Sequence, residues 1–165
     1  MSLTPAGARV LSAQLTLELE RVDKEAIEVT ALALEIESRG PDQTLLWAAA
    51  GHLQAFYNGI EGLLLRVIKE ADGAAPSGAD SHLEIARQAA LDIPEVRPAL
   101  VDPALSEALA PYRAFRHFFR HAYGVTLSWE KMREKLLAAR LVYQQFADAV
   151  SRFREFLRQV ADLGG

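Results

Sequence analysis

The chain has 165 residues, a formal net charge of −4 and no cysteine. This length suits one domain with a continuous core, and we expect residues 1–165 to form it. The missing cysteines exclude disulfide scaffolds, thiolate metal sites and cysteine nucleophiles, and the net negative charge confines any nucleic-acid contact to a local patch. Because no apolar run is long enough to span a membrane and no leader-like segment follows Met1, we expect a cytoplasmic protein that does not bind membranes.

The first predicted element is a long helix that Gly40 and Pro41 end. Its apolar residues follow a 4-3 spacing that places them on one side: Leu15, Leu19, Val22, Ala26, Val29, Ala33 and Ile36. Acidic residues collect along the same segment: Glu18, Glu20, Asp23, Glu25, Glu28, Glu35 and Glu37. We interpret these acids as a solvated face.

Asp42 can cap a second helix that continues to Ala71. Three glycines within it, Gly51, Gly59 and Gly62, each weaken a helix by about 1 kcal/mol relative to alanine, which indicates that another helix approaches closely there. Residues 72–78 are a loop by composition.

A short third helix begins at Asp80 or Ser81 and ends before Pro94, and the prolines that follow predict an extended connector. Asp102 and Pro103 cap and open a fourth helix, which Pro111 kinks or restarts and Gly124 stops.

A fifth helix runs from about Ser128 to Leu163. Its apolar positions keep a 3-4 spacing: Trp129, Met132, Leu136, Ala139, Tyr143, Phe146, Val150, Phe153, Leu157 and Val160. No segment alternates as a strand does. The sequence therefore predicts an all-α, antiparallel, up-and-down bundle of about five helices.

Residues 112–123 separate into two faces on a helical wheel. The apolar arc contains Phe115, Phe118, Phe119 and Ala122, and the opposite arc contains Arg113, Arg116, His117, Arg120 and His121. The basic arc includes no acid, which favours selection for an anionic ligand; the alternative is a solvated face paired to acids elsewhere in the bundle. His52 and His82 stand alone in the sequence, and we assign them no chemistry.

Arginine is a permanent cation, and histidine can pass a proton near neutral pH. Together they supply what cleavage of an RNA phosphodiester needs without a metal: an acid or base, and a fixed positive charge for the phosphorane. Arg116 and His121 point about 140° apart on an ideal helix. One phosphate can meet both only if the last turn distorts near Gly124 or a second copy of the chain completes the site, and dimerisation about a two-fold axis is the simpler solution.

The segment Arg116 to Tyr123 resembles the signature of the HEPN superfamily, specifically of HepT-like ribonuclease toxins encoded beside a minimal nucleotidyltransferase (MNT) antitoxin. That signature is Arg, four residues, His, any residue, Tyr, with a polar residue commonly after the arginine, a place that His117 takes here. The segments 57–61 and 93–98 also resemble members of this group. The resemblance covers most of the chain from the second helix onward.

The resemblance implies a metal-independent, cofactor-free endoribonuclease that acts as a homodimer with both signatures lining one cleft. His121 would act as general base or acid, and Arg116 would hold the scissile phosphate, leaving a 2′,3′-cyclic phosphate. DNA would be excluded because it lacks the 2′-hydroxyl. Tyr123 corresponds to the tyrosine that an MNT partner adenylylates in some relatives. Auxiliary phosphate contacts would come from three further residues, Arg113, His117 and Arg120.

Other interpretations stay open at this point. The fold could serve as a non-catalytic HEPN module that binds RNA or protein and is associated with a nucleotidyltransferase. Tyr123 could be a core or interface tyrosine, His121 could cap the helix C-terminus, and Glu61 could be a buried partner for one arginine. A metal site at His117 and His121 is disfavoured because Phe118 stands where a zincin has glutamate.

Overall fold

The computed structural model describes residues 3–78, 80–122 and 124–163. Five α-helices follow one another: α1 Pro5–Arg39, α2 Gln43–Val67, α3 Ser81–Ala89, α4 Pro103–Arg120 and α5 Trp129–Asp162. A π-helical turn, η1 Ile68–Asp72, extends α2. Within the described residues there is no strand, and the predicted all-α bundle is confirmed.

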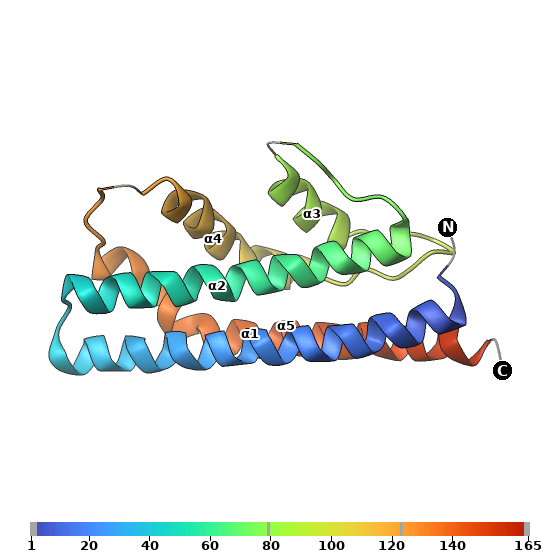
Figure 1. Ribbon diagram of the computed structural model, residues 1–165, viewed down its shortest axis with the longest axis horizontal. Coiled ribbons are helices and arrows are strands. Elements are labelled where there is room, and N and C mark those ends of the chain that lie inside the picture. Colours follow the sequence, from blue (N-terminus) through green and yellow to red (C-terminus); the bar gives the residue numbers. More distant parts are fainter. Residues whose placement is uncertain (1–2, 79, 123, 164–165) are drawn as a thin grey trace.

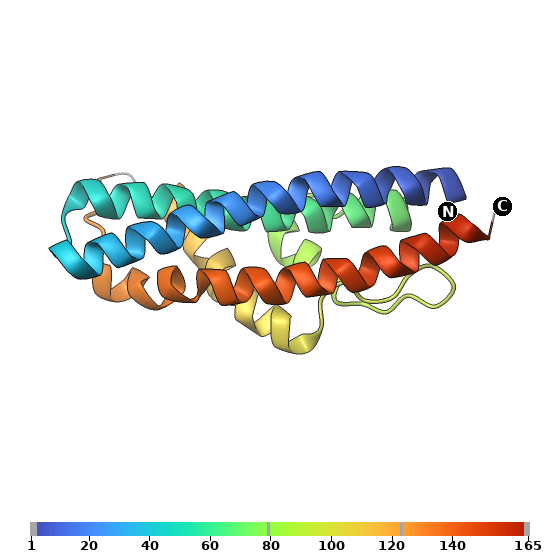
Figure 2. The same ribbon diagram turned by 90° about the horizontal axis from the view of Figure 1, so that it is seen from below.

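Three long helices, α1, α2 and α5, form the body of the molecule, and α3 and α4 lie against α2 on the side away from α1 (Figure 1). The direction of the chain alternates through α1, α2, α4 and α5, as in an up-and-down bundle. The start of α1 and the end of α5 meet at one end of the bundle (Figures 1 and 2), where Arg9 donates to the carbonyl of Ala161 at 3.0 Å.

Local sequence signals set the helix ends. Thr4, Asp42 and Asp102 accept hydrogen bonds from backbone N–H groups of the first turns of α1, α2 and α4. Gly40 ends α1 with a φ of 86°, a left-handed conformation that glycine adopts without strain. Pro111 lies inside α4 and does not begin a new helix.

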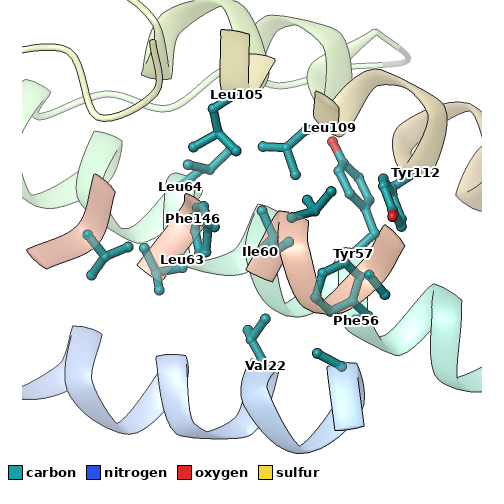
Figure 3. Close-up of a cluster of buried hydrophobic side chains, with 14 of the residues drawn as sticks. Val22, Phe56, Tyr57, Ile60, Leu63, Leu64, Leu105, Leu109, Tyr112 and Phe146 are labelled. Atoms are coloured by element: carbon teal, nitrogen blue, oxygen red, sulfur yellow. The ribbon is translucent and has the colours of Figure 1, made fainter. Parts of the chain in front are cut away.

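The core lies between α1, α2, α4 and α5. Figure 3 shows Phe56, Ile60 and Leu63 of α2 among side chains of α1, α4 and α5, including Val22 and Phe146. The apolar positions predicted for α1 and α5 are buried or pack against this core. Their helical spacing was therefore a reliable guide to the buried faces.

Of the three glycines of α2, only Gly59 marks a close approach to another helix. A Cβ atom at Gly59 would lie 2.8 Å from Cγ2 of Val22 on α1, whereas Cβ atoms at Gly51 and Gly62 would meet nothing within 4 Å. The interpretation was correct for Gly59 and wrong for the other two, which occupy exposed helix positions.

Four of the seven acids predicted to form a solvated face of α1 pair with neighbouring helices, whereas Glu20 and Glu28 are exposed as predicted. Glu18 pairs with Arg66 and Glu25 with His52 on α2, while Asp23 pairs with Arg140 and Glu37 with Arg133 on α5. Charged side chains on the rim of the bundle thus join α1 to both partners.

The connector before α4 is a compact loop rather than an extended segment. Ile93 and Arg97 form an antiparallel bridge, and the Arg97 side chain, which is wholly buried, makes a two-point ion pair with Asp72 at 2.6 and 2.8 Å. Asp72, expected to begin a loop, is instead the last residue of η1. In the described part of the chain, no helix combines the length and apolarity needed to cross a membrane.

Candidate active site

The basic segment lies at the C-terminal end of α4, which stops at Arg120, before the expected stop at Gly124. The N–H groups of His121 and Ala122 bond to carbonyls three residues back, Phe118 and Phe119, so the chain tightens as it leaves the helix. His121 is therefore the C-cap residue of α4, and the direction that an ideal helical wheel assigns to a side chain applies only up to Arg120. The predicted site residues separate into two groups on this segment.

Arg116 points toward α2 and α3. Its Nε donates to Oδ1 of Asn58 at 2.5 Å, its Nη1 lies 3.1 Å from Nε2 of His82, and its Nη2 lies 3.7 Å from Oε1 of Glu61. Only 12 % of its side chain is exposed. The guanidinium is thus fixed by three neighbours from two other helices, with its charge partly balanced by one carboxylate.

Glu61 is a buried acid at the centre of this group, with 7 % of its surface exposed. Its Oε1 lies 2.8 Å from Nδ1 of His82, and its Oε2 is buried without a hydrogen-bond partner among the described residues. A carboxylate in such surroundings needs positive charge nearby, and Arg116 supplies it. The interpretation of Glu61 as a buried partner for one arginine agrees with this geometry.

His82, at the start of α3, is the functional candidate that sequence reasoning missed. It lies 21 positions after Glu61 in the sequence, and no motif joins the two residues. Only the packing of α3 against α2 brings its imidazole between Glu61 and Arg116. His52 was also judged isolated, and it is paired too, with Nδ1 at 2.7 Å from Oε2 of Glu25.

Arg113, one turn before Arg116, faces the hydroxyl of Tyr57 on α2. Burial and the nearby charge of Glu61 raise the pKa of Tyr57 to about 12, while Arg113 and Arg116 oppose the rise. Figure 3 shows the Tyr57 ring rising toward α4 between Leu109 and Tyr112. Arg113 and Arg116 therefore share one polar neighbourhood against α2.

The second group consists of exposed residues on the other side of the segment. The rings of His117 and His121 lie with their centroids 4.9 Å apart, and Nδ1 of His121 lies 2.8 Å from the carbonyl oxygen of His117. Because a carbonyl only accepts, Nδ1 of His121 is the donor, and Nε2 is the nitrogen available for proton transfer. Arg120 is exposed as well, whereas Tyr123 lies outside the described residues.

Phe118 was assigned to the apolar arc, but 47 % of its surface is exposed. It borders an apolar pocket of about 410 Å³ between α4 and the start of α5, whose wall includes Phe115, Leu127 and Met132 and whose edge carries Lys131 and Lys135. Within the described ranges, no three acidic, histidine or cysteine side chains gather as metal ligands would.

A helical bundle with Arg116 and His121 at the end of α4 has the form expected of a HEPN-class protein. A family model described as HepT-like protein matches residues 48–157, and the chain belongs to this HepT-like family of the HEPN superfamily. The match begins in α2 and ends in α5, so it includes both groups of site residues. No curated protein and no solved structure matches the chain.

Proposed function

We propose that this HepT-like protein is a metal-independent endoribonuclease of a HEPN/MNT toxin–antitoxin pair. Arg116 would bind the scissile phosphate and stabilise the charge that develops on it, and His121 would exchange protons with the reacting oxygens. Attack by the 2′-hydroxyl would leave a 2′,3′-cyclic phosphate and a 5′-hydroxyl. Arg113, His117 and Arg120 would contact neighbouring phosphates.

The observation that carries the proposal is the fixed guanidinium of Arg116. Its three neighbours hold it in place before any ligand arrives, which is the preorganisation that stabilises a phosphorane without reorganisation during the reaction. The accessible Nε2 of His121 follows five residues later.

The two groups also support a composite site made by a homodimer. Arg116 turns toward α2 and α3, whereas His121 bonds to the exposed end of its own helix. A two-fold axis close to the ends of two α4 helices would place the His121 of one subunit beside the Arg116 of the other. The antitoxin would be an MNT-type nucleotidyltransferase that adenylylates Tyr123, adding negative charge at the RNA site.

A direct assay tests the proposal. Purified protein, freed of any adenylyl group, is incubated with total RNA and excess chelator, and the ends of the products are identified. We expect cyclic phosphate ends, and a loss of cleavage by about 100-fold or more in Arg116→Ala and His121→Ala. Arg133→Ala is the matched control, because Arg133 pairs with Glu37 at an exposed site on α5. If RNA stays intact in the presence of the native chain, the proposal that the protein is an endoribonuclease is refuted.

A non-catalytic module that binds RNA or protein is the second candidate. The contact between Arg116 and Glu61 favours it, because a carboxylate beside the arginine weakens the attraction of that arginine for phosphate. This candidate predicts that RNA binds and is recovered uncut, and that Arg116→Ala changes affinity alone. The assay above separates the two candidates.

A further inference from the structure

His82 makes two hydrogen bonds whose directions define its protonation state. Arginine has donors only, so Nε2 of His82 accepts the bond from Nη1 of Arg116 at 3.1 Å and carries no proton. Nδ1 therefore bears the proton and donates it to Oε1 of Glu61 at 2.8 Å. His82 is a neutral imidazole, oriented by a buried carboxylate, with its basic nitrogen facing the guanidinium.

We propose that His82 is the general base of the ribonuclease, taking the proton of the 2′-hydroxyl while Arg116 holds the adjacent phosphate. This inference rests on the proposed function and divides the proton transfers between two histidines. His82 has a fixed orientation and lies next to the group that binds the phosphate. Its Nε2 lone pair accepts from Nη1 of Arg116 without a ligand, and it becomes free for the 2′-hydroxyl once Nη1 turns to the phosphate while Asn58 and Glu61 still hold the guanidinium. One third of its side chain is exposed, so a ribose can reach it.

The step balances without a further reactant. The 2′-hydroxyl gives its proton to Nε2 of His82, and its oxygen forms a bond to phosphorus. The bond from phosphorus to the 5′-oxygen breaks, and that oxygen receives a proton from Nε2 of a protonated His121. The products are a 2′,3′-cyclic phosphate and a 5′-hydroxyl, and exchange with water restores both histidines.

The charged groups that face His82 come from two neighbouring helices. Glu61 of α2 lies beside Nδ1 and Arg116 of α4 beside Nε2, and Arg113 of α4 shares the same polar neighbourhood through Tyr57. Glu84 of α3 pairs with Arg87, and Asp72 of η1 pairs with Arg97.

Two substitutions at His82 distinguish a base from a residue that only holds Arg116 in place. His82→Gln keeps an acceptor for Arg116 and a donor for Glu61 but cannot take up a proton. His82→Ala removes the acceptor, the donor and the titratable group together. If His82 is the base, kcat should fall by about 100-fold or more in both variants, and the ascending limb of the pH–rate profile should disappear. Cleavage by His82→Gln at close to the native rate would overturn the inference.

His52→Gln is the matched control, because His52 makes the same kind of pair with Glu25 at a site without a catalytic arginine. This variant should cleave at the native rate. Circular dichroism should show the same helix content for all three variants, so that an unfolded protein is not mistaken for a loss of catalysis.

An RNA substrate with sulfur in place of the leaving 5′-oxygen tests the division of roles, because a thiolate leaves without protonation. His121→Ala should recover much of its rate on this substrate, whereas His82→Gln should remain slow. Recovery by His82→Gln would show that His82 is not the base.

Nitrogen-15 NMR of the imidazoles provides a measurement independent of activity. At a pH at which His82 is neutral, we expect its proton on Nδ1, and a proton on Nε2 would overturn the inference. A native chain that cleaves no RNA refutes the proposed function and this inference with it. Native cleavage together with an active His82→Gln variant refutes the inference alone.

Discussion

Arg97 donates to Asp72 through two nitrogens, and their side chains are 0 % and 7 % exposed. Arg97 also donates to the carbonyls of Leu91 and Gln88, so one guanidinium joins the end of α2 to the loop before α4. This contact holds in place the loop that leads into α4, the helix that carries Arg116.

We expect Arg97→Ala to lower the free energy of unfolding by about 3–5 kcal/mol, because it leaves Asp72 as an uncompensated buried charge. Arg133→Ala, which removes an exposed pair with Glu37, should cost at most about 1 kcal/mol. Urea denaturation measures both. A similar, small cost for the two variants would contradict the structural role given to the buried pair.

The helices were predictable from the sequence because their signals are local. Asp42 and Asp102 cap helices through bonds to residues three positions later, and the periodic apolar residues of α5 identify its buried face. The position of His82 between Glu61 and Arg116 was not predictable, because the three residues come from three helices and no spacing connects them. Arg116 and His121 were found because one segment carries both.

Glycine positions show the same limit. Gly51, Gly59 and Gly62 occupy equivalent local settings within α2, and only the tertiary contact with Val22 distinguishes Gly59. Alanine at Gly51 or Gly62 should stabilise the protein by about 1 kcal/mol each through helix propensity. Gly59→Ala should destabilise it by about 1–3 kcal/mol, because Val22 has to move.

Thermal unfolding of these variants measures the differences, and the double variant Gly59→Ala/Val22→Ala identifies their cause. If the clash with Val22 is responsible, alanine at residue 59 should cost less in a chain that already has alanine at residue 22. An unchanged cost would place the strain elsewhere.

Tyr57 should make the protein sensitive to alkaline pH. Burial raises the pKa of its phenol from 10.0 to about 12. Below pH 10 the phenol is protonated in both states, and above it the unfolded chain ionises first, which favours unfolding. The free energy of unfolding should therefore fall by about 2 kcal/mol between pH 10 and 12 on account of this residue.

Urea titrations across this range test the assignment. The stability of Tyr57→Phe should decline less steeply with pH than that of the native chain. Tyr143→Phe is the control, because burial is smaller there and its phenol contributes less. Parallel curves for the native chain and Tyr57→Phe would show that this phenol ionises equally in both states.

Mixing inactive variants should reveal which subunit supplies each group of a composite site. Arg116→Ala and His121→Ala, unfolded and refolded together, should regain roughly a quarter of the native activity, since half of the dimers are mixed and each mixed dimer has one complete site. His82→Gln should likewise regain activity with His121→Ala. It should regain none with Arg116→Ala, because His82 and Arg116 contact each other within one subunit and every mixed site lacks one of them. If the mixture of His82→Gln with Arg116→Ala is active, His82 does not act in the same site as the Arg116 of its own subunit. If no mixture recovers activity, Arg116 and His121 of one site come from the same subunit.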